Sequence, residues 1–270
     1  MPVQVVLVGC GNMGYAMLEG WLGSGRLEAS ETIVVEPVDA LRERAATLGV
    51  TVYPDASQLH PDTKPRVVVF AVKPQVILDV IPAYAPMAGT TTYLSVAAGT
   101  QIAAFQNALG PDAAIIRCMP NTPAAIGKGM MVTVDNGKVD AATSEFVEAL
   151  LASNGRVATI PEESLMDAVT AVSGSGPAYV FHFIECLTAA GETAGLPSET
   201  AKLLAMQTVF GAASLAAESG TEPGELRRQV TSPNGTTAAA LSVFMDDDRL
   251  KTLVTGAVDA ARRRSVELGA

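Results

Sequence analysis

A glycine-rich segment near the N-terminus has the residue types and the spacing of a phosphate-binding turn. It spans residues 9–14 and reads Gly9, Cys10, Gly11, Asn12, Met13 and Gly14. In a GxGxxG pattern the first glycine allows a tight turn, the second lets the backbone approach a pyrophosphate, and the third lets a helix pack closely on a strand. The helix that follows would meet the phosphates with its N-terminus. The spacing therefore predicts a dinucleotide-binding site.

An acidic residue stands where such a site needs one. Glu36 ends the second expected strand, at the position where a carboxylate meets the ribose of the adenosine half. The alternative is a glycine-rich turn between a strand and a helix that binds no ligand. We favour the dinucleotide site, because the glycine motif lies between an expected strand and an expected helix at the start of the chain.

Two later strand ends also offer ligand contacts, because ligands of open α/β sheets bind at the carboxyl ends of the strands. The first reads Ala71, Val72, Lys73 and Pro74. Lys73 could meet a phosphate or a ribose, or it could be a solvated lysine before a helix. The second, residues 95–99, consists of small residues, which leave room for a flat ligand or simply pack closely.

Polar residues in the second half of the chain suggest a site for an anion. Asn121 lies in a loop stiffened by two prolines, and residues 173–177 and 230–237 interrupt apolar segments with small polar side chains. Hydroxyls and free N–H groups at a helix start can hold a carboxylate or a phosphate. For the second interruption, plain capping of the next helix by Thr236 is the alternative.

Nucleophilic and metal chemistry find little support in the sequence. Cys10 has no evident base beside it, and we interpret His60 and His182 as structural. Three widely spaced cysteines fit neither a disulfide framework nor a CxxC metal site, so reduced thiols in a cytosolic protein are the simpler interpretation. With two histidines and no ligand spacing, we expect no zinc site.

The expected elements give the frame that would position these residues. Strands at residues 3–8, 32–35, 67–72, 91–96 and 113–118 alternate with helices at 12–23, 39–48, 75–83 and 101–108. This alternation predicts a doubly wound Rossmann sheet, an α/β fold, over residues 1–161. Strands at 130–134 and 156–160, on either side of a helix at 141–152, would close its edge. Residues 162–270 read as helices only, with breaks at 174–177 and 232–235.

The composition limits the partners. Lys and Arg number 18 and Asp and Glu number 28, which gives a net charge of −10 and no basic footprint for nucleic acid or an anionic membrane. The N-terminus has no basic region of a signal peptide, and the apolar stretch at 178–190 is too short to span a bilayer. We therefore expect a cytoplasmic protein that binds small molecules.

Several motifs in order resemble one family. GCGNMG, AVKPQ, SVAAG, RCMPNTP, SGSGPAYVF and VTSPNGTTAAAL follow one another from residue 9 to residue 241. Together they resemble Δ1-pyrroline-5-carboxylate reductase, the last enzyme of proline biosynthesis. The resemblance implies that a Rossmann domain binds NAD(P)H, that a helical domain forms a homodimer, often within a ring of five dimers, and that the active site lies between them. It also implies hydride transfer to C5 of the cyclic imine, giving L-proline.

The resemblance also assigns residues. Residues 9–14 and 71–74 would contact the cofactor, with Ala98 near its nicotinamide end. By the same motifs, Thr236 and Thr237 would bind substrate, and from their loops we add Asn121, Ser175, Ser232 and Gly235 to the expected substrate site. Thr237 would hydrogen-bond the ring nitrogen, and we assign it the catalytic role.

Two positions depart from the family pattern. Asn234 replaces a usual glycine, but Asn tolerates a positive φ better than most residues. Glu36 stands where many members carry small or polar residues that admit a 2′-phosphate, which favours NADH here. Arg42 and Arg44, in the helix that follows, could soften the repulsion of a 2′-phosphate.

Two other functions remain open at this stage. One is another hydride-transfer enzyme, acting on a keto acid or a prephenate-like substrate, although such enzymes usually bring a His or Lys base. The other is a regulator that senses dinucleotide without turnover, which would not need the loops at 173–177 and 230–237. For the assembly we expect at least a dimer, because Tyr179, Val180, Phe181, Phe183 and Ile184 crowd one short helix with few polar partners.

Overall fold

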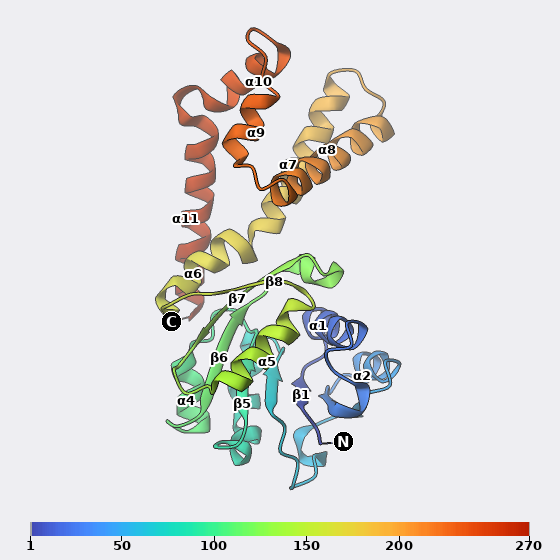
Figure 1. Ribbon diagram of the computed structural model, residues 1–270, viewed down its shortest axis with the longest axis vertical. Coiled ribbons are helices and arrows are strands. Elements are labelled where there is room, and N and C mark those ends of the chain that lie inside the picture. The colour runs from blue at the N-terminus through green and yellow to red at the C-terminus, as the bar shows by residue number, and fades with distance from the viewer. Residues whose placement is uncertain (1, 270) are drawn as a thin grey trace. The chain divides into compact units, whose positions relative to one another are not determined.

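The computed structural model describes residues 2–269 and divides the chain into two compact units (Figure 1). The sheet unit comprises the chain up to Ser175 together with the end of the last helix, from Ala261 onward. The helical unit runs from Gly176 to Ala260. The sequence suggests a domain boundary between residues 161 and 162, and this boundary stays a prediction. The two compact units meet later in the chain, between Ser175 and Gly176.

The sheet unit is built on eight strands in the order β3-β2-β1-β4-β5-β6-β7-β8. The strands are β1 (Val5–Val8), β2 (Thr32–Val35), β3 (Thr51–Tyr53), β4 (Val67–Phe70), β5 (Thr92–Ser95), β6 (Ala114–Met119), β7 (Gly129–Asp135) and β8 (Gly155–Thr159). The first six are parallel, whereas β7 pairs antiparallel with β6 and parallel with β8. This is the predicted doubly wound Rossmann architecture, extended beyond β6 by the two additional strands expected from the sequence, of which β8 forms the edge.

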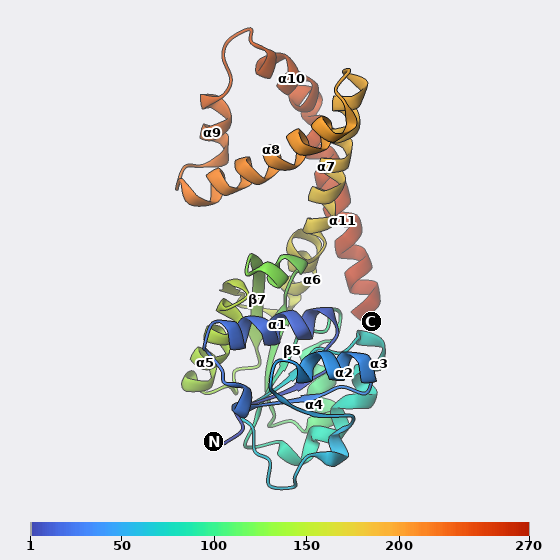
Figure 2. The same ribbon diagram turned by 90° about the vertical axis from the view of Figure 1, so that its right-hand side faces the viewer.

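Alternate residues of the inner strands enter two separate cores. Val5 and Leu7 of β1 pack in one core, and Val6 and Val8 pack in the other. All four are buried, because helices cover both faces of the sheet (Figure 2). A continuous apolar strand is therefore what this position in the fold requires.

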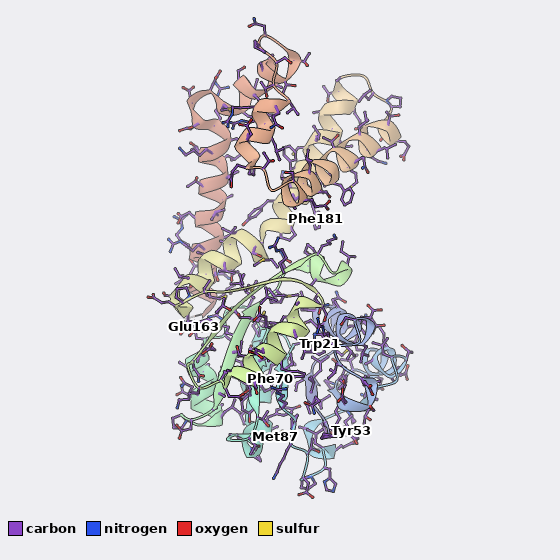
Figure 3. All side chains as sticks on the ribbon, in the orientation of Figure 1. Trp21, Tyr53, Phe70, Met87, Glu163 and Phe181 are labelled. Atoms are coloured by element: carbon purple, nitrogen blue, oxygen red, sulfur yellow. The ribbon has the colours of Figure 1, made fainter. Side chains whose placement is uncertain are left out.

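Helices from alternating connections form the two covering layers. The α-helices of this unit are α1 (Asn12–Gly23), α2 (Asp39–Ala46), α3 (Pro74–Val80), α4 (Ile102–Leu109), α5 (Ala141–Ala152) and α6 (Met166–Val169). Trp21 of α1 lies in the first core with residues of α5, whereas Phe105 of α4 and Phe70 of β4 lie in the second (Figure 3). Phe70 contacts the rings of Tyr84, Tyr93 and Phe105, with ring centroids 5.3 to 6.2 Å apart.

The chain continues through the expected break at residues 174–177 with less disruption than predicted. Thr170–Gly174 forms a single π-helical turn, and α7 begins directly after it at Gly176. A Cβ at Gly174 would lie 2.3 Å from the terminal methyl group of Met119. The glycine there allows close packing against the end of β6, and the predicted break between two helices falls at Ser175, the bend between the π-helical turn and α7. Pro177 lies in the first turn of α7, as predicted.

The helical unit contains α7 (Gly176–Thr193), α8 (Ser198–Glu218), α9 (Pro223–Gln229), α10 (Thr236–Met245) and the first part of α11 (Arg249–Gly269). Helices α7 and α8 pack side by side. Apolar side chains on α7 remain exposed, among them Val180, Phe181 and Phe183 (Figure 3). Among the residues that the structure describes, no helix is both long and apolar enough to cross a membrane.

Candidate active site

The glycine-rich turn has the geometry that the sequence predicts for each glycine. Gly9 adopts a φ of +89°, which side chains rarely allow. A Cβ at Gly14 would lie only 2.3 Å from the carbonyl oxygen of Gly9, so helix α1 packs closely on the turn. A Cβ at Gly11 would have no atom within 4 Å. Gly11 therefore leaves open the space through which a pyrophosphate can approach the backbone.

The N-terminus of α1 is free to meet an anion. Gly11 is the N-cap residue, no side chain caps the helix, and the first turn holds no acidic residue. The first N–H groups of a helix lack partners within the helix, and the helix dipole favours a negative charge beside them. These residues therefore fit the pyrophosphate of a dinucleotide, which supplies that charge.

Glu36 lies at the end of β2, and its carboxylate faces the glycine-rich turn. The side chain is buried, with 4% of the residue exposed. One carboxylate oxygen accepts the N–H of Cys10 at 2.6 Å, and the other accepts the N–H of Val38 at 2.9 Å. The acid that the sequence assigns to the adenosine ribose is thus also a structural partner of the turn.

Arg44 of α2 holds the same turn from the carbonyl side. Its guanidinium donates to the carbonyl oxygens of Cys10 at 3.0 Å and of Gly11 at 3.3 Å. It also stacks over the ring of Tyr15, 4.0 Å from the ring centroid. From the sequence we expect Arg44 only to soften the repulsion between Glu36 and a 2′-phosphate. Its contacts with the glycine-rich turn were not predicted.

The thiol of Cys10 is held in its neutral form. The residue is fully buried, and burial raises its pKa to about 11, with the Glu36 charge adding to the rise and Arg44 opposing it. Burial likewise raises the pKa of Cys118 to about 12. Neither thiol is a thiolate near neutral pH, so neither has the form that acts as a nucleophile.

The loops that follow β4 and β5 line one cavity of about 530 Å³. Three residues assigned from the sequence lie on its wall, namely Pro74, Ala98 and Ser175. Lys73 is the exposed N-cap residue of α3, directly before Pro74. Ala71 and Val72 lead from β4 into that helix, and both lie against the glycine-rich turn. The end of α11 completes the wall of the cavity, which the sequence analysis did not foresee.

Asn121 has a structural role that its loop position did not reveal. Its side-chain N–H donates to the carbonyl oxygen of Ser173 at 3.1 Å, and its side-chain oxygen accepts the N–H of Met130 at 2.9 Å. Both ends of the amide are thus bonded within the protein. Contact of this residue with a substrate stays a prediction.

The turn at residues 232–237 belongs to the helical unit. Asn234 adopts a φ of +59°, as expected for a residue that replaces a glycine. Gly235 is the N-cap residue of α10, no side chain caps the helix, and Thr236 and Thr237 form its first turn. The alternative of capping by Thr236 is therefore wrong. The uncapped helix start, with the hydroxyls of Ser232 and the two threonines close in sequence, can hold a carboxylate.

Family models and known proteins match this chain over nearly its whole length. The model of the pyrroline-5-carboxylate reductase dimerisation domain matches residues 163–268, and the model described as NADP oxidoreductase coenzyme F420-dependent matches residues 4–99. The pyrroline-5-carboxylate reductase of Pseudomonas aeruginosa is 39% identical over 267 residues, covering 98% of this chain and 96% of that protein. The chain belongs to the pyrroline-5-carboxylate reductase family. Members of this family are NAD(P)H-dependent oxidoreductases that catalyse the final step of proline biosynthesis, and membership gives this chain that activity.

Solved structures of the family agree with the fold. A pyrroline-5-carboxylate reductase from Coxiella burnetii is 32% identical, with a TM-score of 0.93 and full coverage of both chains. A pyrroline carboxylate reductase from Plasmodium falciparum, solved with NADP bound, is 28% identical, with a TM-score of 0.85 and coverage of 99% and 98%. The sheet unit is accordingly the NADP-binding domain of the family, and the dimerisation domain indicates a homodimer.

Metal chemistry finds no site in the described part of the chain. Within residues 2–269, no group of three or more His, Cys, Asp and Glu side chains is placed to hold a metal ion.

The reductase activity of the family also excludes the alternative function of a regulator that binds dinucleotide without turnover.

Proposed function

We propose that the chain reduces L-Δ1-pyrroline-5-carboxylate to L-proline in the cytoplasm, using NADH at least as well as NADPH. The observation that supports the cofactor site best is the open approach to Gly11 at the uncapped N-terminus of α1. Free thiols at Cys10, Cys118 and Cys186 support a reducing compartment.

The residues at the glycine-rich turn and at residues 71–74 would hold the cofactor, and Ala98 would lie by its reactive end. When bound, the reduced nicotinamide supplies a hydride. The hydride adds to C5 of the cyclic imine, and the C=N bond becomes a C–N single bond. The ring nitrogen carries its proton already if the substrate binds as the iminium ion, so the protein need not supply a strong acid. This accounts for a site without a catalytic histidine or thiolate.

The turn at residues 232–237 would bind the substrate. Its helix N-terminus supplies N–H donors for the substrate carboxylate, which the net charge of −10 would otherwise repel. The Thr237 hydroxyl would hydrogen-bond the ring nitrogen and fix the orientation of the imine. Ser175, which lines the same cavity as Ala98, is a further residue that we assign to the substrate. Catalysis would then come mainly from positioning.

Glu36 supports the use of NADH. Its buried carboxylate at the end of β2 can accept a hydrogen bond from a ribose 2′-hydroxyl, whereas it repels a 2′-phosphate. Arg44 lies at the same turn and offsets part of that repulsion. We therefore propose that NADH is preferred or equal, without exclusion of NADPH.

For the assembly, we propose that homodimers associate further into a ring of five dimers. Apolar side chains that remain exposed on α8, such as Leu203, Met206 and Phe210, support contacts beyond those made by α7. Light scattering of the purified protein tests this. A mass of ten chains is expected, and a dimer that persists at micromolar concentration would contradict the ring.

Steady-state assay of the purified protein with pyrroline-5-carboxylate and each reduced nucleotide tests the function. We expect turnover with both and a kcat/KM for NADH at least equal to that for NADPH. Faster reduction of a keto acid would indicate the first alternative function. Nucleotide binding without turnover of pyrroline-5-carboxylate would contradict the proposed substrate site.

A further inference from the structure

The loop at residues 97–101, between β5 and α4, forms part of the cavity where the reactive end of the cofactor is proposed to lie. Ala98 and Gly99 of this loop line the cavity together with Pro74 and Gln75. Gly99 adopts a φ of +79°, so the loop has a conformation that few other residues could hold. The position of this loop determines the shape of the site.

The last turn of α11 lies directly against this loop, backbone to backbone. The carbonyl oxygen of Leu268 lies 3.5 Å from the place where a Cβ of Gly99 would be. In return, a Cβ at Gly269 would lie 2.9 Å from the carbonyl oxygen of Gly99. Because Gly99 and Gly269 have no side chains, the backbone of the loop and the backbone of the helix end can touch directly. Any displacement of the end of α11 would reach the loop directly.

One part-buried hydrogen bond fixes the end of α11 to the body of the sheet unit. The hydroxyl of Ser265 donates to the carboxylate of Asp167 on α6 at 2.6 Å. Only 6% of Ser265 is exposed. A hydrogen bond to a carboxylate is shorter and stronger than one between neutral groups, and burial limits competition from water. Ser265 also lines the cavity, one helical turn before Leu268.

The same short segment holds the other end of the loop. Glu163, four residues before Asp167, accepts the N–H of Ile102 at 2.9 Å, where α4 begins (Figure 3). The same carboxylate oxygen accepts from the buried guanidinium of Arg117 at 2.8 Å. Residues 163–167 therefore hold the loop directly at Ile102, and hold it at Gly99 through Ser265 and α11.

We propose that Ser265 is a positioning residue for hydride transfer, acting through the end of α11 on the loop at residues 97–101. This inference rests on the proposed function, since it assigns the loop to the reactive end of the cofactor. The bond between Ser265 and Asp167 keeps the loop in place against the nicotinamide. The glycine-rich turn, which binds the other half of the dinucleotide, does not depend on it.

Variants of this pair test the proposal. Ser265→Ala removes the donor and Asp167→Ala removes the acceptor, whereas Asp167→Asn keeps an oxygen that accepts the same hydrogen bond. We expect kcat to fall about tenfold in each alanine variant, since small displacements at a reacting centre have effects of this size. The Kd for NADH, measured by fluorescence, should change by less than about twofold. Asp167→Asn should keep most of the activity, and the double alanine variant should be no worse than either single one.

Hydrogen exchange of the protein without nucleotide gives a readout that is independent of turnover. Amides at residues 97–101 should exchange faster in Ser265→Ala, whereas those of α1 should not change. Unchanged exchange in the loop, or an equal loss of NADH affinity and kcat, would overturn the proposal. If Ser265→Ala does not fold, Asp167→Ala carries the same measurements. Absence of turnover in the unmodified protein would count against the proposed function. The role of Ser265 is tested separately, by hydrogen exchange of residues 97–101 and by the Kd for NADH.

Discussion

The carboxylate of Glu36 accepts a hydrogen bond of 2.6 Å from the backbone N–H of Cys10, 26 residues earlier in the chain. This bond joins the end of β2 to the glycine-rich turn. The acid that we propose selects the coenzyme therefore also shapes the turn that we propose binds it. A change at Glu36 should alter both the nucleotide preference and the stability of the glycine-rich turn in the protein without nucleotide.

Glu36→Gln should shift the coenzyme preference toward NADPH. The charge that repels a 2′-phosphate is lost, and the amide can accept only one of the two backbone N–H groups that Glu36 accepts. We expect the ratio of kcat/KM for NADPH to that for NADH to rise about 5- to 30-fold, or about 1–2 kcal/mol. Glu43→Gln removes the same charge from an exposed position on α2 and is the matched control. An unchanged ratio, or an equal shift in the control, would show that Glu36 does not select the coenzyme.

Arg44→Lys should weaken the binding of both nucleotides. Lysine keeps the charge but loses the planar group that reaches the carbonyl oxygens of Cys10 and Gly11 and stacks on Tyr15. We expect the Kd of each nucleotide to rise about 5- to 20-fold, as for the loss of one or two hydrogen bonds. Arg44→Met, which also removes the charge, should weaken NADPH more than NADH. Equal affinities in the original protein and Arg44→Lys would refute the role of the guanidinium.

Cys10 should contribute to stability at neutral pH and lose that contribution in alkali. Its folded pKa is raised from 9.0 to about 11, so the contribution is complete below pH 9 and is lost as the pH rises through about 11. Urea unfolding of the protein and of Cys10→Ala at pH 8, 10 and 11 measures the difference. The gap in unfolding free energy between the two proteins should narrow above pH 9. We also expect Cys10→Ala to turn over substrate, and loss of kcat with intact folding would assign the thiol a chemical role.

The sequence was most informative where one local cause fixed the structure. The limits of α1, Asn12–Gly23, follow from the glycine motif before it and the Ser-Gly pair after it. The continuous apolar strands follow from burial on both faces. Strand β3 was missed because Thr51–Tyr53 is short, lies at the sheet edge and is partly exposed, so it has no buried pattern to detect.

The parts of the site that escaped prediction depend on contacts between distant residues. From the sequence Arg44 was expected only to offset the charge of Glu36, and the approach of α2 to the glycine-rich turn gives it contacts that no local pattern indicates. Ser265 directly follows three charged residues near the end of α11, so the local sequence does not mark it as buried, yet it packs against Asp167, 98 residues earlier. We assign Asn121 to the substrate from its position in a loop. The hydrogen bonds that its side-chain amide forms with Ser173 and Met130 could not be predicted from that position.

Thr237→Val should separate substrate binding from nucleotide binding. The substitution keeps the shape of the side chain and removes the hydroxyl that we assign to the ring nitrogen. Thr237 is half-buried in the first turn of α10, so replacing it with valine exposes little additional apolar surface to water. The loss of one such contact is worth about 1–3 kcal/mol, or about 5- to 150-fold in kcat/KM for pyrroline-5-carboxylate.

Nucleotide affinity should stay nearly unchanged in Thr237→Val, because the residues assigned to the dinucleotide belong to the sheet unit. Thr193→Val is the matched control, since its hydroxyl bonds the carbonyl oxygen of Ala189 within α7 and has no assigned ligand. The control should keep the original kcat/KM. Weaker NADH binding in Thr237→Val, together with normal turnover at saturating cofactor, would place the substrate contact elsewhere. Ser175 would then be the first residue to test, because it lines the cavity beside Ala98 and Gly99, whereas the amide of Asn121 is already bonded at both ends.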